Sequence, residues 1–128
     1  MKYISDDNFK KFCSHVQEGM ESLAKAIEDG IHPQYAKPAT VYIGIPGEKN
    51  NFCRLAYSCF DRDKKDILTL SAGVIRKGTD AIFETFYFNG TEQEFIDYVR
   101  KPVYDCKKLT EHLVKLSDRC NEYREDRE

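Results

Sequence analysis

The sequence predicts a single α+β domain over residues 1–128, built on a four-stranded antiparallel meander in the order 1-2-3-4. Two observations predict this class. Four strand-like stretches follow one another with no room for a helix between them, and a helical pattern of about twenty residues flanks each side. The meander is therefore expected between one N-terminal helix and two C-terminal helices. The four stretches are 40–45, 52–60, 67–76 and 81–89.

The first helix is predicted from a capping residue, Ser5 or Asp6, to a terminating glycine, Gly30. Gly19 lies beside its apolar face. Because a glycine inside a helix costs about 1 kcal/mol relative to alanine, Gly19 marks either the close approach of another element or an incidental surface position. The apolar face recurs at steps of three and four: Phe9, Phe12, Cys13, Val16, Met20, Leu23, Ala24 and Ile27.

The C-terminal part predicts a short helix and a long one. Thr91 and Glu94 have the spacing of a capping box, and Pro102 should interrupt the helix that they start. The last helix carries a narrow apolar seam, which favours packing against the first helix and the sheet, with dimerisation through the seam as the alternative. The seam consists of Cys106, Leu109, Leu113, Leu116, Cys120 and Tyr123.

Alternation along the strands separates the two faces of the sheet, because successive side chains point to opposite sides. One face is apolar enough to form the core, and both long helices are expected to cover it. Its members are Val41, Ile43, Ile45, Cys53, Leu55, Tyr57, Cys59, Leu68, Leu70, Ala72, Val74, Phe83, Thr85 and Tyr87.

The second face supplies the candidate functional residues. The expected pairing places Arg54, Gly73 and Glu84 in one lateral row, and Gly44 joins it beside Arg54 if the first hairpin has an odd loop. Small residues between aromatic ones predict a shallow trough there. The two neighbouring rows are Tyr42, Ala56, Ser71 and Phe86, followed by Thr40, Ser58, Thr69 and Phe88; from these rows the candidate ligand- or partner-binding residues are Tyr42, Arg54, Ser71, Glu84, Phe86 and Phe88.

Three interpretations of this second face stay open. It is a partly solvated surface with a structural Arg54–Glu84 pair, a homodimer or partner-protein surface, or a small-molecule site using the same two charged residues. The protein-surface interpretation rests on five large apolar residues that are too many to leave wet on a soluble monomer: Phe52, Ile75, Ile82, Phe86 and Phe88.

Composition and charge exclude several classes of function. The chain is 41% hydrophobic and 33% charged, with a net charge of −2 and interleaved signs. Because nucleic-acid binders carry a clustered basic footprint, no nucleic-acid partner is expected. No apolar run is long enough to cross a bilayer, and the N-terminus lacks the apolar segment of a signal peptide. We therefore expect no membrane association and a cytoplasmic location.

The cysteines and histidines predict neither a metal site nor a cofactor. None of the five cysteines is spaced as Cys-x-x-Cys, and no histidine has a cysteine or carboxylate partner at the spacing of a triad. We interpret the thiols as buried packing groups in a reducing compartment.

By elimination, the sequence favours a small non-catalytic protein-interaction module, similar in kind to immunity, inhibitor or adaptor proteins. It is expected to act as a homodimer or by binding a partner protein. The alternative is a small-ligand-binding protein or enzyme that uses Arg54 and Glu84, so that catalysis is less expected but stays open.

Overall fold

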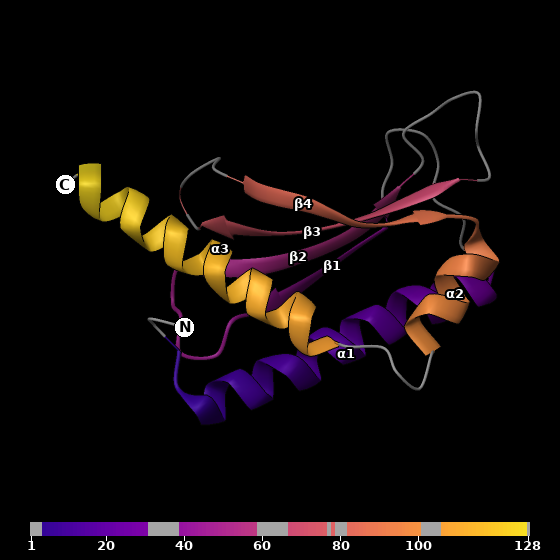
Figure 1. Ribbon diagram of the computed structural model, residues 1–128, viewed down its shortest axis with the longest axis horizontal. Coiled ribbons are helices and arrows are strands. Elements are labelled where there is room, and N and C mark those ends of the chain that lie inside the picture. Colours follow the sequence, from indigo (N-terminus) through magenta and orange to yellow (C-terminus); the bar gives the residue numbers. More distant parts are fainter. Residues whose placement is uncertain are drawn as a thin grey trace.

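The computed structural model describes residues 4–30, 39–58, 67–76, 78, 82–100 and 106–127, without the side chains of residues 82–86 and 123–127. The element order is one helix, four strands and two helices, as predicted (Figure 1). The predicted features at Cys59, Phe60 and Pro102 lie outside the described residues.

The N-terminal helix α1 spans Asp6–Glu28, and both of its predicted ends are confirmed. The hydroxyl oxygen of Ser5 accepts a hydrogen bond from the Asn8 backbone N–H at 3.2 Å, which satisfies one of the unpaired donors of the first turn. Gly30 follows the helix with φ of 90°, a left-handed conformation that glycine adopts without steric cost.

The four strands form one antiparallel sheet in the order β1-β2-β3-β4, which confirms the meander. The apolar alternation in the sequence is what specifies this arrangement, because a slip of one residue would move a whole strand's apolar set to the other face. The strands are β1 Ala39–Gly44, β2 Asn51–Ser58, β3 Leu68–Arg76 and β4 Ile82–Gly90.

The capping box at the start of α2 (Glu92–Arg100) forms in both directions. The Thr91 backbone N–H donates to Glu94 Oε1 at 3.1 Å, and the Glu94 backbone N–H donates to Thr91 Oγ1 at 3.2 Å. The last helix, α3, spans Cys106–Arg127 and packs against α1, β2 and β3. Its seam is consequently buried inside the chain at Leu109, Leu113, Leu116 and Cys120.

Gly19 marks a close helix–sheet contact. A Cβ placed on it would lie 2.9 Å from Ile43 Cδ1 and 3.1 Å from Leu55 Cδ1, both on the covered face of the sheet. The absence of a side chain lets α1 approach β1 and β2 closely, so the first of the two interpretations of this glycine is confirmed.

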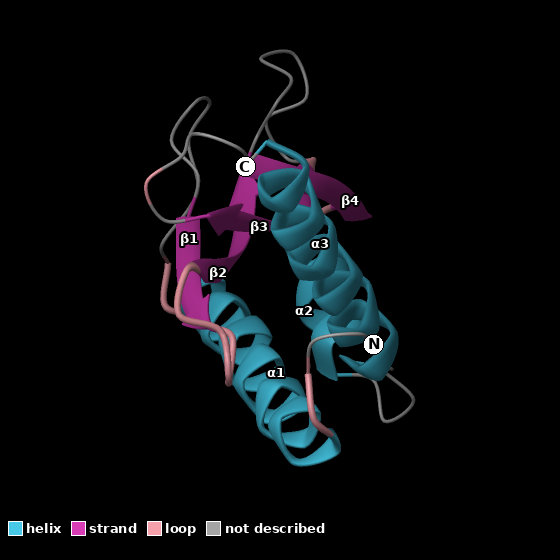
Figure 2. Ribbon diagram, turned by 90° about the vertical axis from the view of Figure 1, so that its left-hand side faces the viewer, coloured by secondary structure: helices cyan, strands magenta, loops and turns pink. Residues whose placement is uncertain are grey.

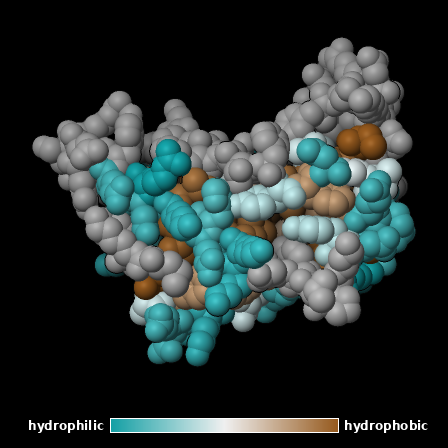
Figure 3. All heavy atoms as spheres, viewed as in Figure 1, coloured by the Kyte–Doolittle hydropathy of each residue, from teal (hydrophilic) through white to brown (hydrophobic). Residues whose placement is uncertain are grey.

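All three helices lie on the same side of the sheet (Figures 1 and 2). The core between the layers combines the apolar face of α1 with side chains from the strands and from α2 and α3, including the fully buried Phe12, Leu55, Tyr57, Leu70 and Leu113. The outward surface of α3 carries hydrophilic side chains (Figure 3), such as the exposed Lys107, Lys108, Lys115 and Arg119.

No helix within the described part of the chain combines the length and the apolar character needed to cross a membrane.

Candidate functional site

The face of the sheet opposite the helices, here called the open face, contains the predicted row of Arg54, Gly73 and Glu84. Arg54 pairs with Gly73 across β2 and β3, and Gly73 pairs with Glu84 across β3 and β4. The fourth member differs from the expectation, because Tyr42 and not Gly44 pairs with Arg54. Strand alternation specifies which face a residue occupies, but the length of the β1–β2 connection decides which residue of that face lies opposite Arg54.

Small side chains form the floor of the open face. Ala56 and Ser71 are paired, and only 2% and 5% of their surfaces are exposed. The Ser71 hydroxyl donates to the Ala56 carbonyl oxygen at 3.5 Å, so its polar group has a partner inside the chain. Ser71 is therefore part of the floor in this structure, although the sequence suggested it as a contact residue.

Large side chains on β1 and β2 rise beside this floor. Tyr42 is 65% exposed and Phe52 is 37% exposed, and they are the large hydrophobic side chains that the described residues leave most accessible. Arg54 is the cross-strand partner of Tyr42 and follows Phe52 by two residues on β2, and it is half-buried. One side of the open face thus presents two aromatic rings to solvent, with the half-buried Arg54 beside them.

The expected position of Phe88 on the open face is wrong. A bulge in β4 leaves Tyr87 as an extra residue, since Ser71 pairs with Phe86 and Leu70 pairs with Phe88. The inserted residue reverses the alternation of the strand from that point on, and Thr69 pairs with Asn89 instead.

Phe88 consequently packs on the helix-covered side. Its ring stacks on Tyr98 of α2 at a centroid distance of 5.0 Å and contacts Phe95 at 5.8 Å. Tyr87 also turns toward the helices, where its ring meets His112 of α3 edge-on at 5.5 Å. The bulge is favourable because it packs Phe88 against two aromatic rings of α2 instead of leaving it on the open face.

Glu84 and Phe86 keep the backbone positions that the sequence predicted. Glu84 pairs with Gly73, and Phe86 pairs with Ser71, so both belong to the open face by register. Their side chains lie outside the described part of the structure.

A buried polar network on the covered face was not predicted from the sequence. Asn51 pairs with Arg76 at one end of β2 and β3, and both are nearly inaccessible, at 1% and 7% exposure. Asn51 Nδ2 donates to Ser117 Oγ at 2.8 Å, and Arg76 Nη1 donates to Asn121 Oδ1 at 2.7 Å. Asn121 Nδ2 in turn donates to Glu48 Oε1 at 2.9 Å.

This network joins the sheet to α3 and its polar groups satisfy one another, which is what buried polar groups require. We interpret it as structural. The sequence contains a signal that could have revealed this network, namely a polar residue at a core-facing strand position. Asn51 lies on the same face as Cys53, and Arg76 lies on the same face as Val74.

Among the four described cysteines, Cys53 and Cys120 are buried, as predicted, whereas Cys13 and Cys106 are only half-buried. Burial raises the pKa of Cys53 to about 12 and that of Cys120 to about 11, so both stay protonated at neutral pH. The Cys106 thiol donates to the Cys13 carbonyl oxygen at 3.5 Å. Within the described residues no three His, Cys, Asp or Glu side chains cluster in a way that could hold a metal ion.

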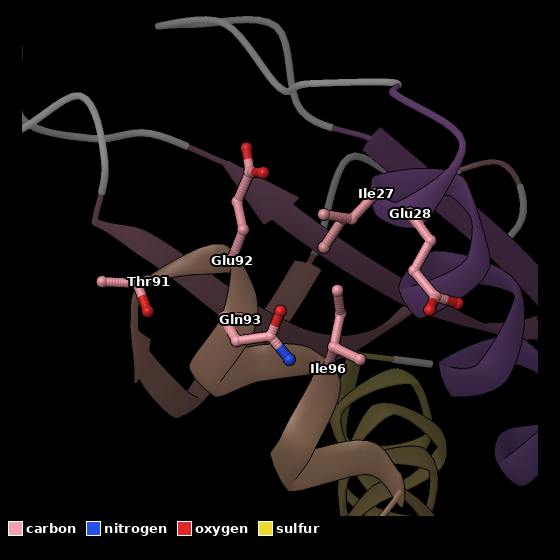
Figure 4. Close-up of a pocket in the computed structure, with 6 residues that line it drawn as sticks. All are labelled: Ile27, Glu28, Thr91, Glu92, Gln93 and Ile96. Carbon is pink, nitrogen blue, oxygen red and sulfur yellow. The ribbon is translucent and has the colours of Figure 1, made fainter.

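A surface hollow lies away from the open face, between the end of α1 and the start of α2 (Figure 4). On its rim, Glu28 and Arg100 form a bidentate ion pair. Arg100 Nη1 donates to Glu28 Oε2 at 2.7 Å, and Arg100 Nη2 donates to Glu28 Oε1. That hydrogen bond lowers the pKa of the Glu28 carboxyl. The pair joins α1 to α2, and the hollow is lined by Ile27, Glu28, Thr91, Glu92, Gln93 and Ile96.

No protein-family model, curated protein or solved structure matches this chain.

Proposed function

We propose that the protein is a non-catalytic protein-interaction module whose contact surface is the open face of the sheet. One observation carries this proposal. The three helices pack on one side of the sheet, whereas the other side leaves Tyr42 and Phe52 exposed beside a floor of small residues. Exposed aromatic side chains of this kind are enriched at protein–protein interfaces.

The shape of the open face favours a protein over a small molecule. Small-molecule sites are concave and enclose most of their ligand. Tyr42 instead keeps about two thirds of its surface accessible, as its 65% exposure shows, on an edge strand of the sheet. A flat partner surface can cover such a ring, and Arg54 beside it adds the residue type that is most often an energetic anchor together with tyrosine.

The cellular setting that we propose is the cytoplasm. It is supported by Cys13, Cys53, Cys106 and Cys120, which are all free thiols, as a reducing compartment maintains them. The evenly mixed charge supports a protein rather than a nucleic-acid partner, because phosphate binding needs a concentration of positive charge.

Photochemical crosslinking tests the proposal. Tyr42 or Phe52 is replaced by p-benzoyl-phenylalanine in the cells from which the gene comes, and adducts are identified by mass spectrometry after irradiation. We expect a discrete polypeptide adduct from both positions. Lys10 on α1 and Lys115 on α3 are exposed positions on the helical layer and serve as matched controls that should give none.

Failure to obtain a polypeptide adduct from either open-face position would refute the proposal. The small-ligand alternative makes the opposite prediction: a metabolite raises the melting temperature by several degrees, and Arg54→Ala removes the increase.

A further inference from the structure

We propose that Cys13 on α1 and Cys106 at the start of α3 form an oxidative modification site, at which a peroxide converts the two thiols into a disulfide between the helices. The observation that carries this proposal is a contact between the two residues, since Cys106 Sγ lies 3.5 Å from the Cys13 carbonyl oxygen. Both helices lie on the side of the sheet away from the open face (Figures 1 and 2), so the site is independent of the proposed function.

Covalent geometry limits how far apart the two cysteines can be. A carbonyl oxygen lies about 2.4 Å from its own Cα, so the Cys106 sulfur is within about 6 Å of the Cys13 Cα. Disulfides join residues whose Cα atoms are about 4.4–6.8 Å apart. Because the Cys106 sulfur already contacts the backbone of Cys13, bond formation requires rotation of the two side chains and a small shift between the helices.

The position of Cys106 in its helix allows that shift. Cys106 is the first residue of α3, and the first backbone N–H groups of a helix have no intrahelical acceptor. Its sulfur contacts the Cys13 carbonyl oxygen at 3.5 Å and Thr110 Oγ1 at 3.7 Å, and a thiol is a weak hydrogen-bond donor. Turning the sulfur toward the Cys13 thiol therefore gives up little of the free energy of these two contacts.

Accessibility separates this pair from the other described cysteines. Cys13 and Cys106 are half-buried at the edge of the core, whereas only 0% and 1% of the surfaces of Cys53 and Cys120 are exposed. Burial also raises the pKa of these two core thiols, and the thiolate is the form that reacts with an oxidant. The structure therefore favours oxidation at Cys13 and Cys106 over oxidation in the core.

The reaction consumes one molecule of hydrogen peroxide for the pair of thiols. The thiolate of one cysteine attacks a peroxide oxygen, which breaks the O–O bond and gives a sulfenic acid and, with the proton of the thiol, water. The sulfur of the other cysteine then attacks the sulfenic sulfur. The S–S bond forms as the S–O bond breaks, and the hydroxyl leaves as water with the second thiol proton. The two sulfurs together give up two electrons, which reduce the peroxide.

The disulfide would join residues that are 93 positions apart in the sequence. A crosslink between distant residues lowers the conformational entropy of the unfolded chain, so the oxidised protein should have the higher urea midpoint. A reducing cytoplasm keeps the two thiols apart, and oxidising conditions join them. The pair would thus adjust the stability of the helical layer to the redox state of its surroundings.

Peroxide treatment of the folded, reduced protein tests the proposal. The remaining thiols are blocked in urea, and the unreduced digest is mapped by mass spectrometry. We expect a linkage within one chain between the peptides that contain Cys13 and Cys106, with Cys53 and Cys120 alkylated. The linkage should form on the order of tenfold faster in the folded protein than in urea, because folding raises the effective concentration of the two thiols. Dithiothreitol should restore both thiols and the original urea midpoint.

Cysteine variants assign the linkage. Cys13→Ser and Cys106→Ser should each abolish both the linked peptide and the rise in urea midpoint. Cys59→Ser is the matched control, because it removes a cysteine outside the described residues and should change neither. Circular dichroism checks that each variant is folded, and the peptide map of the wild-type protein decides the question if a variant does not fold.

Three results would overturn the proposal. Disulfides between chains, or single overoxidised cysteines, as the main products would show that the two sulfurs do not meet within one chain. A linkage that forms as fast in urea as in the folded protein would owe nothing to the contact between α1 and α3. Linkages of Cys53, Cys59 or Cys120 in comparable yield would show that the fold does not select this pair.

Discussion

The contact between Gly19 and β1 predicts an energetic coupling that can be measured in a double-mutant cycle. In Gly19→Ala, the new methyl group would lie 2.9 Å from Ile43 Cδ1 and 3.1 Å from Leu55 Cδ1. The higher helix propensity of alanine contributes about 1 kcal/mol of stability, and overpacking at the low end of its usual range costs about 1 kcal/mol. We therefore expect Gly19→Ala alone to change the free energy of unfolding little.

Ile43→Val removes the methyl group that causes the closest contact. With glycine at position 19, this change costs about 0.5–1.5 kcal/mol, as for other buried isoleucines. With alanine there, it relieves the 2.9 Å contact, so the double variant should be more stable than the sum of the single changes by about 1 kcal/mol.

The assay is urea denaturation followed by helical circular dichroism, in which all four proteins share one m-value if unfolding stays two-state. Ser14→Ala, at an exposed position of α1, combined with Ile43→Val serves as the control cycle and should be additive. If Gly19→Ala and Ile43→Val also add within about 0.3 kcal/mol, the close approach of α1 to β1 is not the reason for the glycine.

Two further predictions concern polar contacts. Asn51→Ala should lower the free energy of unfolding by about 1–3 kcal/mol, because it leaves buried partners such as Ser117 without their donor. A change in urea midpoint no larger than that of an exposed-site control would contradict this prediction. Arg100→Ala should lower the urea midpoint at pH 7 but not at strongly acidic pH. Arg100 depresses the pKa of Glu28 in the folded state, so the pair stabilises the fold above the ordinary carboxyl pKa, and this contribution is lost as the pH falls through the depressed value. An equal midpoint difference at both pH values would refute the assignment to Glu28.

The elements that the sequence predicted well are those with local signals. The cap at Ser5, the capping box of Thr91 and Glu94 and the alternation in β2 and β3 each involve residues a few positions apart, so one stretch of chain contains the whole signal. The row of Arg54 and Glu84 followed from the same alternation, carried across two hairpins.

The elements that escaped prediction depend on distant contacts. Asn51 and Asn121 are 70 residues apart in the sequence and meet only because α3 crosses the ends of β2 and β3. The position of Phe88 depends on a rearrangement within one strand, which alternation alone does not reveal, because the aromatic side chains of α2 that bury it come later in the chain.

The bulge at Tyr87 divides β4 into two segments whose side chains are constrained by different surroundings. Before it, Glu84 and Phe86 belong by register to the open face, which we propose as the contact surface, whereas after it Phe88 packs on Tyr98 of α2. Residues of the first segment can therefore change without repacking the second. Loss of the single residue Tyr87 would remove that independence, since the alternation of β4 would continue unbroken and Phe88 would turn away from α2 toward the open face.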